Sequence, residues 1–516
     1  MADFMSQVAT KAKDFDPNIS VTENGAIGYR TSGKKLVDLN FMASSMRNMD
    51  DEQIWTRFLE AYNENSDLAV LWLFFCRDLR GGMGERRTFR VIFRRLCFEN
   101  TALALKLLKL IPEYGRWDDM TTLLGGGIPS EIYKEVIEII RAQIYYDVGN
   151  ATHGKPFSLM AKWLPSLNTS SHETRRIAEK LRSELGYSHK DYRKLLSFLR
   201  GRLRVVEKSM SANKWDEIDY EGVPSRASML YREAFATHDR DRYTKYLTNV
   251  KSGNAKINAG ALFPYDIVHA YMNNDAWGEN TKSYDETLEQ QWKALPNTVP
   301  DDQRTLVVVD GSGSMGLRIG NTGVSCHDVA RSLGIYFAER LGGPYKDTFI
   351  TFSARPHVVY LKPELSLQSK LKILIKEDDC SNTDIERTFD LILKTAVDNH
   401  LKQSELPANI LIVSDMEFDA VTYCCRNPKA LFKTIADKFE SAGYKLPRLV
   451  FWNVCSRTGT IPVIENDYGV ALVSGFSPAI ADMVMSGKLD PAEILTDKLM
   501  SERYKPVREA MGDVNG

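Results

Sequence analysis

The hydrophobic pattern of this chain changes character near residue 300. Between about residues 51 and 292, apolar side chains recur at helical spacing, as Ile54, Phe58 and Leu59 do in DDEQIWTRFLEAYNEN. Short breakers such as RGGMGE and LLGGGIPS separate these segments, and RRTFRVIFRRLCFENTALALKLLKLIPEYG predicts two helices that meet near Glu99 and Asn100. Helix after helix with short connections predicts an α-helical repeat region, which we assign to residues 36–295.

After the linker LPNTVPDDQ, short runs of Val, Ile and Leu alternate with amphipathic helices. TLVVVD, ANILIVSDM and PRLVFWNVC predict buried strands, whereas SCHDVARSLGIYFAERLG and TDIERTFDLILKTAVDNHL predict helices. This alternation predicts an α/β doubly wound, Rossmann-like domain over residues 302–500, with helices on both faces of a mostly parallel sheet. TFITFS…HVVYL indicates a hairpin that adds one antiparallel edge strand. A multidomain chain follows, with an N-terminal extension (1–35) and a C-terminal tail (501–516).

Composition excludes several classes of protein. The net charge is -1, so any contact with nucleic acid must come from a local basic surface. The N-terminus lacks the pattern of a secretory signal, and no run of about 18 apolar residues predicts a membrane span. The 7 cysteines are scattered without a CxxC pair, which argues against structural zinc. We therefore expect free thiols and a cytoplasmic protein without a membrane partner.

Polar side chains gather where the predicted strands end. Asp310, Ser312 and Ser314 directly follow TLVVVD, Asp415 follows ILIVS, and Thr383 lies in CSNTD just before a helix. In a doubly wound sheet, binding sites collect at the carboxyl ends of the strands. Carboxylate, hydroxyl and water oxygens suit Mg²⁺, with Mn²⁺ or Ca²⁺ as alternatives. The competing interpretation is a Ser/Gly turn that caps the next helix without a metal.

The same loop does not carry the marks of an enzyme. DGSGS is not the G-x-S-x-G elbow of a serine hydrolase, and no Gly-Lys-Ser/Thr follows it as in a phosphate-binding P-loop. We therefore expect a binding protein without catalytic residues, and rank a metal-dependent hydrolase last.

A basic segment lies in the helical half. Residues 171–210 hold 11 Lys and Arg against 5 Asp and Glu. A basic helical face attracts phosphates through counterion release, and spacing of i, i+4 and i+8 would bring three of these residues to one face. A solvated helix surface is the alternative. Tyr243 and Tyr246 would either stack on bases or belong to the core. The candidate RNA-binding residues are Arg175, Arg176, Arg193, Arg200, Arg204 and Lys208, the last three being the i, i+4, i+8 set.

Charged, glycine-rich corners also stand out in FFCRDLRGGMGERRTF and PEYGRWDDM. Their simplest interpretation is a set of ion pairs between helices, formed by Arg77, Asp78, Arg80, Glu85, Arg86 and Asp118.

Two resemblances sharpen these expectations. Asp310-Gly-Ser312-Gly-Ser314, Thr383 and Asp415 resemble the metal-ion-dependent adhesion site of von Willebrand factor A domains. That resemblance implies that Asp310, Ser312, Ser314 and Thr383 coordinate the ion directly or through water, and that Asp415 does so directly or through a bridging water. It also implies an open coordination position for an Asp or Glu of a partner protein.

The motifs RDLRGGMGERR, EYGRWDDM, AKWLPS and FWNV…GVALVSGFSP resemble a little-characterised family that couples a TROVE-like helical module to an A domain, over about residues 36–487. Ro ribonucleoprotein autoantigens have the same order: a ring of HEAT-like repeats closed by an A domain, which binds structured and single-stranded RNA. The resemblance implies a Ro-like RNA-binding ring or horseshoe. The alternative is a protein-interaction scaffold with no RNA role.

Overall fold

The computed structural model divides the chain into two compact units. The sheet unit comprises Met1–Ala69 and Ala259–Met500, and the helical unit comprises Val70–Asn258 and Ser501–Gly516. The residues described are 17–203, 205–273, 280–299, 304–320, 322–352, 355–377, 384–419, 431–462, 470–477, 483, 488 and 490–512.

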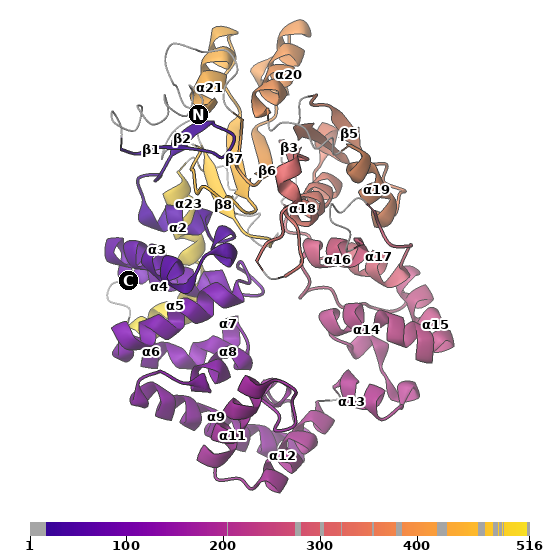
Figure 1. Ribbon diagram of the computed structural model, residues 1–516. Helices are drawn as coiled ribbons and strands as arrows, with labels where there is room; N and C mark the ends of the chain where they lie inside the picture. The colour runs from indigo at the N-terminus through magenta and orange to yellow at the C-terminus, as the bar shows by residue number, and fades with distance from the viewer. Residues whose placement is uncertain are drawn as a thin grey trace, which may run out of the picture. The chain divides into compact units, whose positions relative to one another are not determined.

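A mostly parallel sheet forms the centre of the sheet unit, as predicted (Figure 1). In the described part of the chain it has six strands in the order β5-β4-β3-β6-β7-β8, and only the edge strand β5 is antiparallel to its neighbour β4. Numbered along the chain, this is the order 3-2-1-4-5-6 of the doubly wound fold. The strands are β3 (Thr305–Asp310), β4 (Thr348–Phe352), β5 (Val358–Tyr360), β6 (Asn409–Ser414), β7 (Arg448–Asn453) and β8 (Ala471–Ser474).

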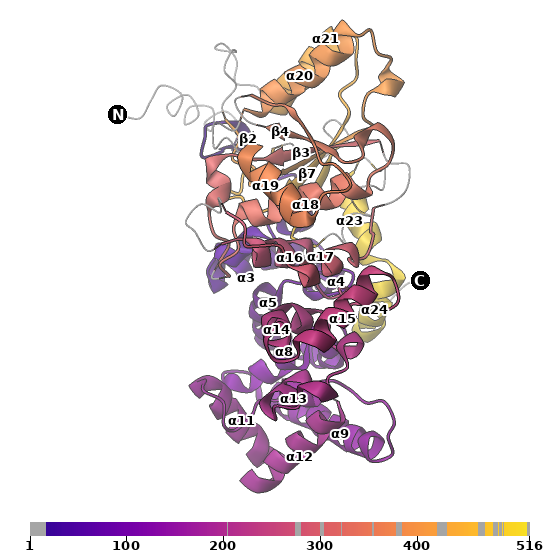
Figure 2. The same ribbon diagram turned by 90° about the vertical axis from the view of Figure 1, so that its right-hand side faces the viewer.

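Helices cover both faces of this sheet, because its strands are apolar on both sides. Phe337 of α18 (Cys326–Arg340) contacts Trp452 of β7 on one face, with ring centroids 5.5 Å apart. On the other face, Phe432 of α21 (Leu431–Ser441) contacts Phe451, with ring centroids 4.7 Å apart, and α20 (Ile385–Asp398) packs beside α21 (Figure 2). The other elements after residue 259 are α16 (Pro264–Tyr271), α17 (Glu286–Lys293), η6 (Gly313–Gly316), η7 (Gly343–Tyr345), α19 (Leu367–Glu377), η8 (Gln403–Glu405) and α23 (Pro491–Leu499).

The N-terminal segment belongs to the sheet unit, which the sequence did not predict. The hairpin of β1 (Ile19–Val21) and β2 (Ile27–Tyr29) bridges to the sheet domain through Tyr29 and Ile461, whose backbones exchange two hydrogen bonds of 2.8 Å. Asn453, at the end of β7, donates to the carbonyl of Phe41 over 2.8 Å. The elements that follow the hairpin are α2 (Lys35–Phe41), η1 (Ser45–Asn48) and α3 (Asp51–Glu64).

The predicted boundary near residues 295–302 therefore needs correction. Residues 36–69 and 259–295, assigned to the helical domain from their periodicity, lie in the sheet unit, because α2 packs on β8 and α16 packs on α18. Amphipathic periodicity identifies a helix but does not say which core its apolar face covers.

The helical unit confirms the predicted succession of helices. Asn100 separates α5 from α6 and caps α6 by accepting a hydrogen bond from the backbone N–H of Leu103 over 3.1 Å. The unit boundary falls within α4. The elements are α4 (Ser66–Arg77), α5 (Arg86–Glu99), α6 (Thr101–Leu107), η2 (Leu108–Leu110), α7 (Ile111–Tyr114), α8 (Trp117–Thr121), η3 (Thr122–Gly125), α9 (Ser130–Thr152), α10 (Met160–Trp163), α11 (His172–Glu184), α12 (His189–Arg202), α13 (Val206–Ser211), η4 (Trp215–Glu217), η5 (Tyr220–Gly222), α14 (Ser225–His238), α15 (Arg240–Lys251), η10 (Glu502–Tyr504) and α24 (Lys505–Met511).

The charged corners form buried ion pairs. Arg77 Nη2 lies 2.7 Å from Asp119 Oδ2, and Arg90 Nε lies 2.6 Å from Asp119 Oδ1. Position 115 has room only for glycine, because a Cβ there would lie 2.5 Å from Asp119 Oδ2 and 2.9 Å from Arg77 Nε. The ion-pair interpretation of RDLRGGMGERR and EYGRWDDM is therefore confirmed for Arg77, with Asp119 as its partner.

Residues 501–512 form part of the helical unit rather than a tail. Arg503 binds both carboxylate oxygens of Asp78 over 2.9 Å, and the ring of Tyr504 stacks on that of Tyr114 with centroids 5.7 Å apart. Neither periodicity nor composition predicts this docking, because the residues that Arg503 and Tyr504 contact lie about 400 residues earlier in the chain.

No helix within the described residues is long and apolar enough to cross a membrane. The described cysteines are free thiols, as predicted: Cys76, Cys97, Cys326 and Cys455.

Candidate metal centre

Two neighbouring central strands bring the predicted ligands together. β3 and β6 pair in parallel, with Val309 opposite Val413, and the strand order reverses between them. Asp310 is the last residue of β3, and Asp415 directly follows β6. The side chains thus lie at the topological switch point, where doubly wound sheets bind their ligands.

The loop after β3 folds around Asp310. The backbone N–H of Ser312 donates to Asp310 Oδ1 over 2.9 Å, and the Oγ atoms of Ser312 and Ser314 lie 3.0 Å apart. On the other side, the hydroxyl of Ser414 donates to Asp310 Oδ2 over 2.6 Å. Asp310 is only 1% exposed, so its orientation is fixed from two strands.

Asp415 completes the group. Its side chain is fully buried and accepts hydrogen bonds from the backbone N–H of Glu417 over 3.2 Å and from Arg457 Nη1 over 3.0 Å. The side chain of Ser314 also hydrogen-bonds to Asp415. Four of the five predicted ligands are therefore adjacent, and Thr383 lies outside the described residues.

The carboxylates of Asp310 and Asp415 repel each other electrostatically. Burial, together with the neighbouring charge of Asp415, raises the pKa of Asp310 to about 8, against the hydrogen bonds from Ser414 and Ser312. Burial also raises the pKa of Asp415, while Arg457 lowers it. Two acids in one buried site cannot both ionise without a compensating cation.

The backbone between Asp415 and Glu417 is strained. Met416 has a φ of 65°, in the left-handed region that costs a residue with a Cβ about 1 kcal/mol or more. Its side chain is buried. Such strain persists only where surrounding contacts impose it, and here it sits at the strand end that carries the acids.

Glu417 is a buried carboxylate that the sequence analysis missed. Three backbone N–H groups donate to it: Glu23 over 2.8 Å, Arg457 over 2.8 Å and Thr458 over 2.9 Å. It thus joins the hairpin turn, the end of β6 and the loop after β7. One sequence signal was available, since this acid stands between the apolar residues Met416 and Phe418 just after the strand ILIVS.

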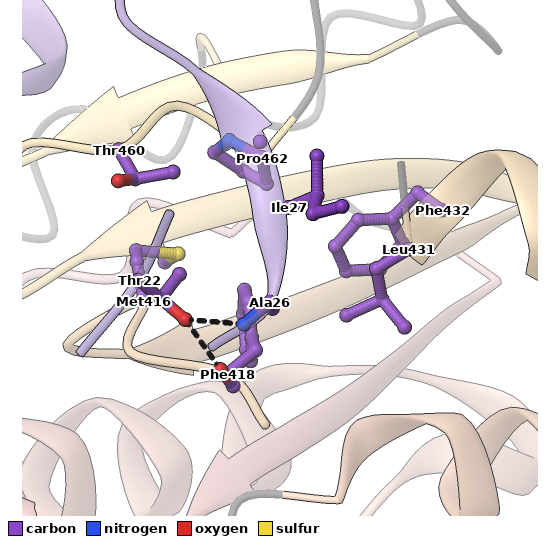
Figure 3. Close-up of a pocket in the computed structure, with 10 residues that line it drawn as sticks. Thr22, Ala26, Ile27, Met416, Phe418, Leu431, Phe432, Thr460 and Pro462 are labelled. Carbon is purple, nitrogen blue, oxygen red and sulfur yellow. Dashed lines mark hydrogen bonds between the residues drawn. The ribbon is translucent and has the colours of Figure 1, made fainter. Parts of the chain in front are cut away.

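The hairpin leaves a small pocket against the sheet domain (Figure 3). Its empty volume is about 220 Å³, counting the open mouth. Met416 forms part of the wall, and the hydroxyl of Thr22 donates to the carbonyl of Phe418 beside it over 2.6 Å. The lining is mostly apolar: Thr22, Ala26, Ile27, Gly28, Met416, Phe418, Leu431, Phe432, Thr460 and Pro462.

The donor set fits a hard divalent cation. Its oxygens come from two carboxylates and two hydroxyls, which is the ligand chemistry of Mg²⁺. Among the described residues, no three His, Cys, Asp or Glu side chains gather closely enough to hold a metal alone. A cation held here would therefore take hydroxyl and water oxygens as its remaining ligands.

The basic residues of the helical unit have diverse roles. The guanidinium of Arg200 donates to the carbonyls of Ala161 and Leu164 and to the hydroxyl of Ser166, each over 2.8 Å, and so fixes the corner after α10. Arg176 donates to the carbonyl of Gly125. The side chains of Arg175, Arg193 and Lys208 are exposed, and Arg204 lies outside the described residues.

The predicted face of Arg200, Arg204 and Lys208 is wrong. α12 ends at Arg202 and α13 begins at Val206, so helical spacing does not relate these residues. Tyr243 and Tyr246 are buried against Tyr220, which confirms the core alternative for them.

Instead, α12 itself carries an exposed stripe. Lys190, Lys194, Phe198 and Arg202 follow at intervals of four residues, and each is exposed. The guanidinium of Arg202 lies 5.7 Å from the ring centre of Phe198.

Comparisons with known proteins give a family without an assigned function. Residues 304–511 match the model of a domain of unknown function, DUF7788, and residues 132–304 match that of another, DUF2828. "Uncharacterized protein L728" of Acanthamoeba polyphaga mimivirus is 30% identical over 527 residues, covering 95% of this chain and 89% of that protein.

The chain is also similar to a solved structure. The crystal structure of the Deinococcus radiodurans RO (RSR) protein is 13% identical, and the alignment covers 79% of this chain and 93% of that one. The TM-score of 0.36 is too low to establish a common fold.

Proposed function

This chain belongs to the same family as the uncharacterized mimivirus protein L728, and we propose that it is a non-enzymatic binding protein with a divalent-cation centre in its sheet unit. The observation that carries this proposal is the burial of Asp310 and Asp415 together at the switch point between β3 and β6. We propose Mg²⁺ as the preferred cation, with Mn²⁺ or Ca²⁺ as alternatives. The proposed ligands are Asp310, Ser312, Ser314, Thr383 and Asp415.

Charge balance supports the proposal. Asp310, Asp415 and Glu417 are all buried, and Arg457 is the cation that pairs with Asp415 among the described residues. Three buried acids beside one guanidinium can ionise together only with a further positive charge, which a divalent cation would supply. A helix-capping turn without metal gives no reason to bury two acids side by side.

We infer that the sheet domain is of the von Willebrand factor A type. The strand order, the Asp-x-Ser-x-Ser loop after the first sheet strand and the acid after β6 support this inference. A bound cation would supply an open position for an Asp or Glu of a partner protein. Isothermal titration of the full chain with MgCl₂ and MnCl₂ tests the centre, and loss of binding in Asp310→Asn is the expected result.

We also propose that the helical unit binds RNA through α12. Lys190 and Lys194 are four residues apart on one helix and repel each other, so this pair lowers the stability of the helix unless an anion faces it, and Arg202 extends the basic stripe. Phe198 adds an exposed aromatic face for stacking on a base. Salt-dependent binding of single-stranded RNA to the full chain tests this role, and no binding at low salt would favour the protein-interaction scaffold instead.

A further inference from the structure

Arg457 connects two carboxylates that lie at different depths. Its Nη1 donates to the fully buried Asp415 over 3.0 Å, and its Nε donates to Glu23 over 2.5 Å. The side chain of Arg457 is 26% exposed and that of Glu23 is 57% exposed. The guanidinium therefore stands between the candidate metal centre and solvent.

The surrounding chain fixes this position. The backbone N–H groups of Arg457 and Thr458 both donate to Glu417. This buried carboxylate therefore fixes the backbone from which the Arg457 side chain extends. The backbone N–H of Glu23 also donates to Glu417, so the same buried carboxylate holds the backbone of both Arg457 and Glu23.

Polar contacts hold the turn that carries Glu23. Thr22 donates to the carbonyl of Phe418, and Asn24 donates to the carbonyl of Glu417 over 2.7 Å. A small pocket lies beneath the hairpin, and the contacts named above that hold its turn are polar (Figure 3). Segments held by few apolar contacts open at lower cost than the core does.

We propose that Arg457 is an internal counter-ion that occupies Asp415 in the metal-free protein, that Glu23 holds it there, and that a divalent cation displaces it and so loosens the hairpin turn. This inference rests on the proposed cation centre. Its physical basis is competition, because the cation and the guanidinium need the same carboxylate of Asp415. Entry of the cation is thereby linked to the contacts between the hairpin and the sheet domain.

Glu23→Gln gives a test in which competing accounts predict opposite signs. In a purely Coulombic account, removal of an exposed negative charge weakens cation binding. In our account, it frees Arg457 to leave Asp415, so Mg²⁺ and Mn²⁺ bind about two- to fivefold more tightly. Glu364→Gln is the matched control, because it removes an exposed acid of the same unit and should leave the affinity unchanged.

The experiment is isothermal titration of the full chain with MgCl₂ and MnCl₂, together with hydrogen exchange of the hairpin amides with and without Mg²⁺. We expect tighter binding in Glu23→Gln and faster exchange at residues 22–26 when Mg²⁺ is bound. Cation binding by the native chain with equal or weaker binding by Glu23→Gln would overturn this inference alone. Absence of cation binding in the native chain and in Glu23→Gln would overturn the proposed centre as well.

Discussion

The hydroxyl of Ser414 donates to Asp310 Oδ2 over 2.6 Å, across the neighbouring strands β6 and β3. This bond joins the two strand ends whose acids form the candidate centre. It leaves Asp310 Oδ1 to the loop, where the N–H of Ser312 donates to it. Ser414 thus orients a proposed ligand without being one itself, as residues just outside a metal site commonly do.

Ser414→Ala should weaken cation binding without abolishing it. Loss of the bond to Asp310 leaves the carboxylate free to rotate, and removal of such a partner lowers metal affinity about tenfold to hundredfold. Titration with MnCl₂ measures the change. Ser441→Ala, on the exposed end of α21, is the control and should bind as the native chain does. Equal affinity in Ser414→Ala would show that the cation does not depend on Asp310.

Burial of His327 should make the fold sensitive to acid. Burial, together with the charge of Arg331, lowers the pKa of His327 from 6.5 to about 3. Below pH 6.5, His327 binds a proton in the unfolded chain but not in the folded chain, so the free energy of unfolding falls as the pH drops toward 3. At pH 5 this residue costs about 2 kcal/mol.

Thermal unfolding of His327→Gln at pH 7 and pH 5 measures this effect. The variant should lose less stability between these pH values than the native chain does. His172→Gln replaces an exposed histidine and should show the native pH dependence. If His327→Gln keeps that dependence in full, another group is responsible for it.

Gly115→Ala should strongly destabilise the helical unit. The added Cβ would meet Asp119 and Arg77, whose buried ion pair has no room to shift. Breaking a buried pair costs about 3–5 kcal/mol. Gly149→Ala is the matched control, because nothing lies within 4 Å of a Cβ there, and a helical alanine should stabilise by about 0.5–1 kcal/mol. Urea unfolding compares the two variants, and a small effect of Gly115→Ala would contradict the rigid corner.

Charge reversal on α12 should weaken RNA binding. In Lys194→Glu/Arg202→Glu, two phosphate contacts are lost, so the dependence of log affinity on log salt should become shallower by about 1–2. Filter binding of a single-stranded RNA over a salt series measures this slope. Lys245→Glu/Lys256→Glu makes the same charge change elsewhere on the unit. Equal weakening by both variants would mean that net charge, and not α12, controls the binding.

Local patterns predicted the sheet domain well, because its strands are short apolar runs that end in polar residues. TLVVVD corresponds residue for residue to β3, and Asp310 and Asp415 meet because carboxyl ends of parallel strands share one edge. The positions of Glu23 and Tyr504 were not predictable in this way. Each depends on a partner about 400 residues away in the chain, and neither periodicity nor composition carries that pairing.

The prediction of a basic helical face was wrong for a related reason. Spacing alone placed Arg200 with Lys208 on one helix, but the chain turns after Arg202, and Arg200 binds backbone carbonyls at the corner after α10. An arginine has five donors, and a loop with unsatisfied carbonyls competes with phosphate for them.

The most direct test of the account is the stability of Asp310→Asn with and without a divalent cation. Asparagine keeps the shape and the bond from Ser312 but removes the buried charge beside Asp415. In EDTA the variant should unfold at a higher temperature than the native chain, by a few degrees. With millimolar Mg²⁺ or Mn²⁺ the native chain should gain stability and the variant should not. A variant that is less stable in EDTA, or that gains as much from the cation as the native chain does, would contradict the metal centre.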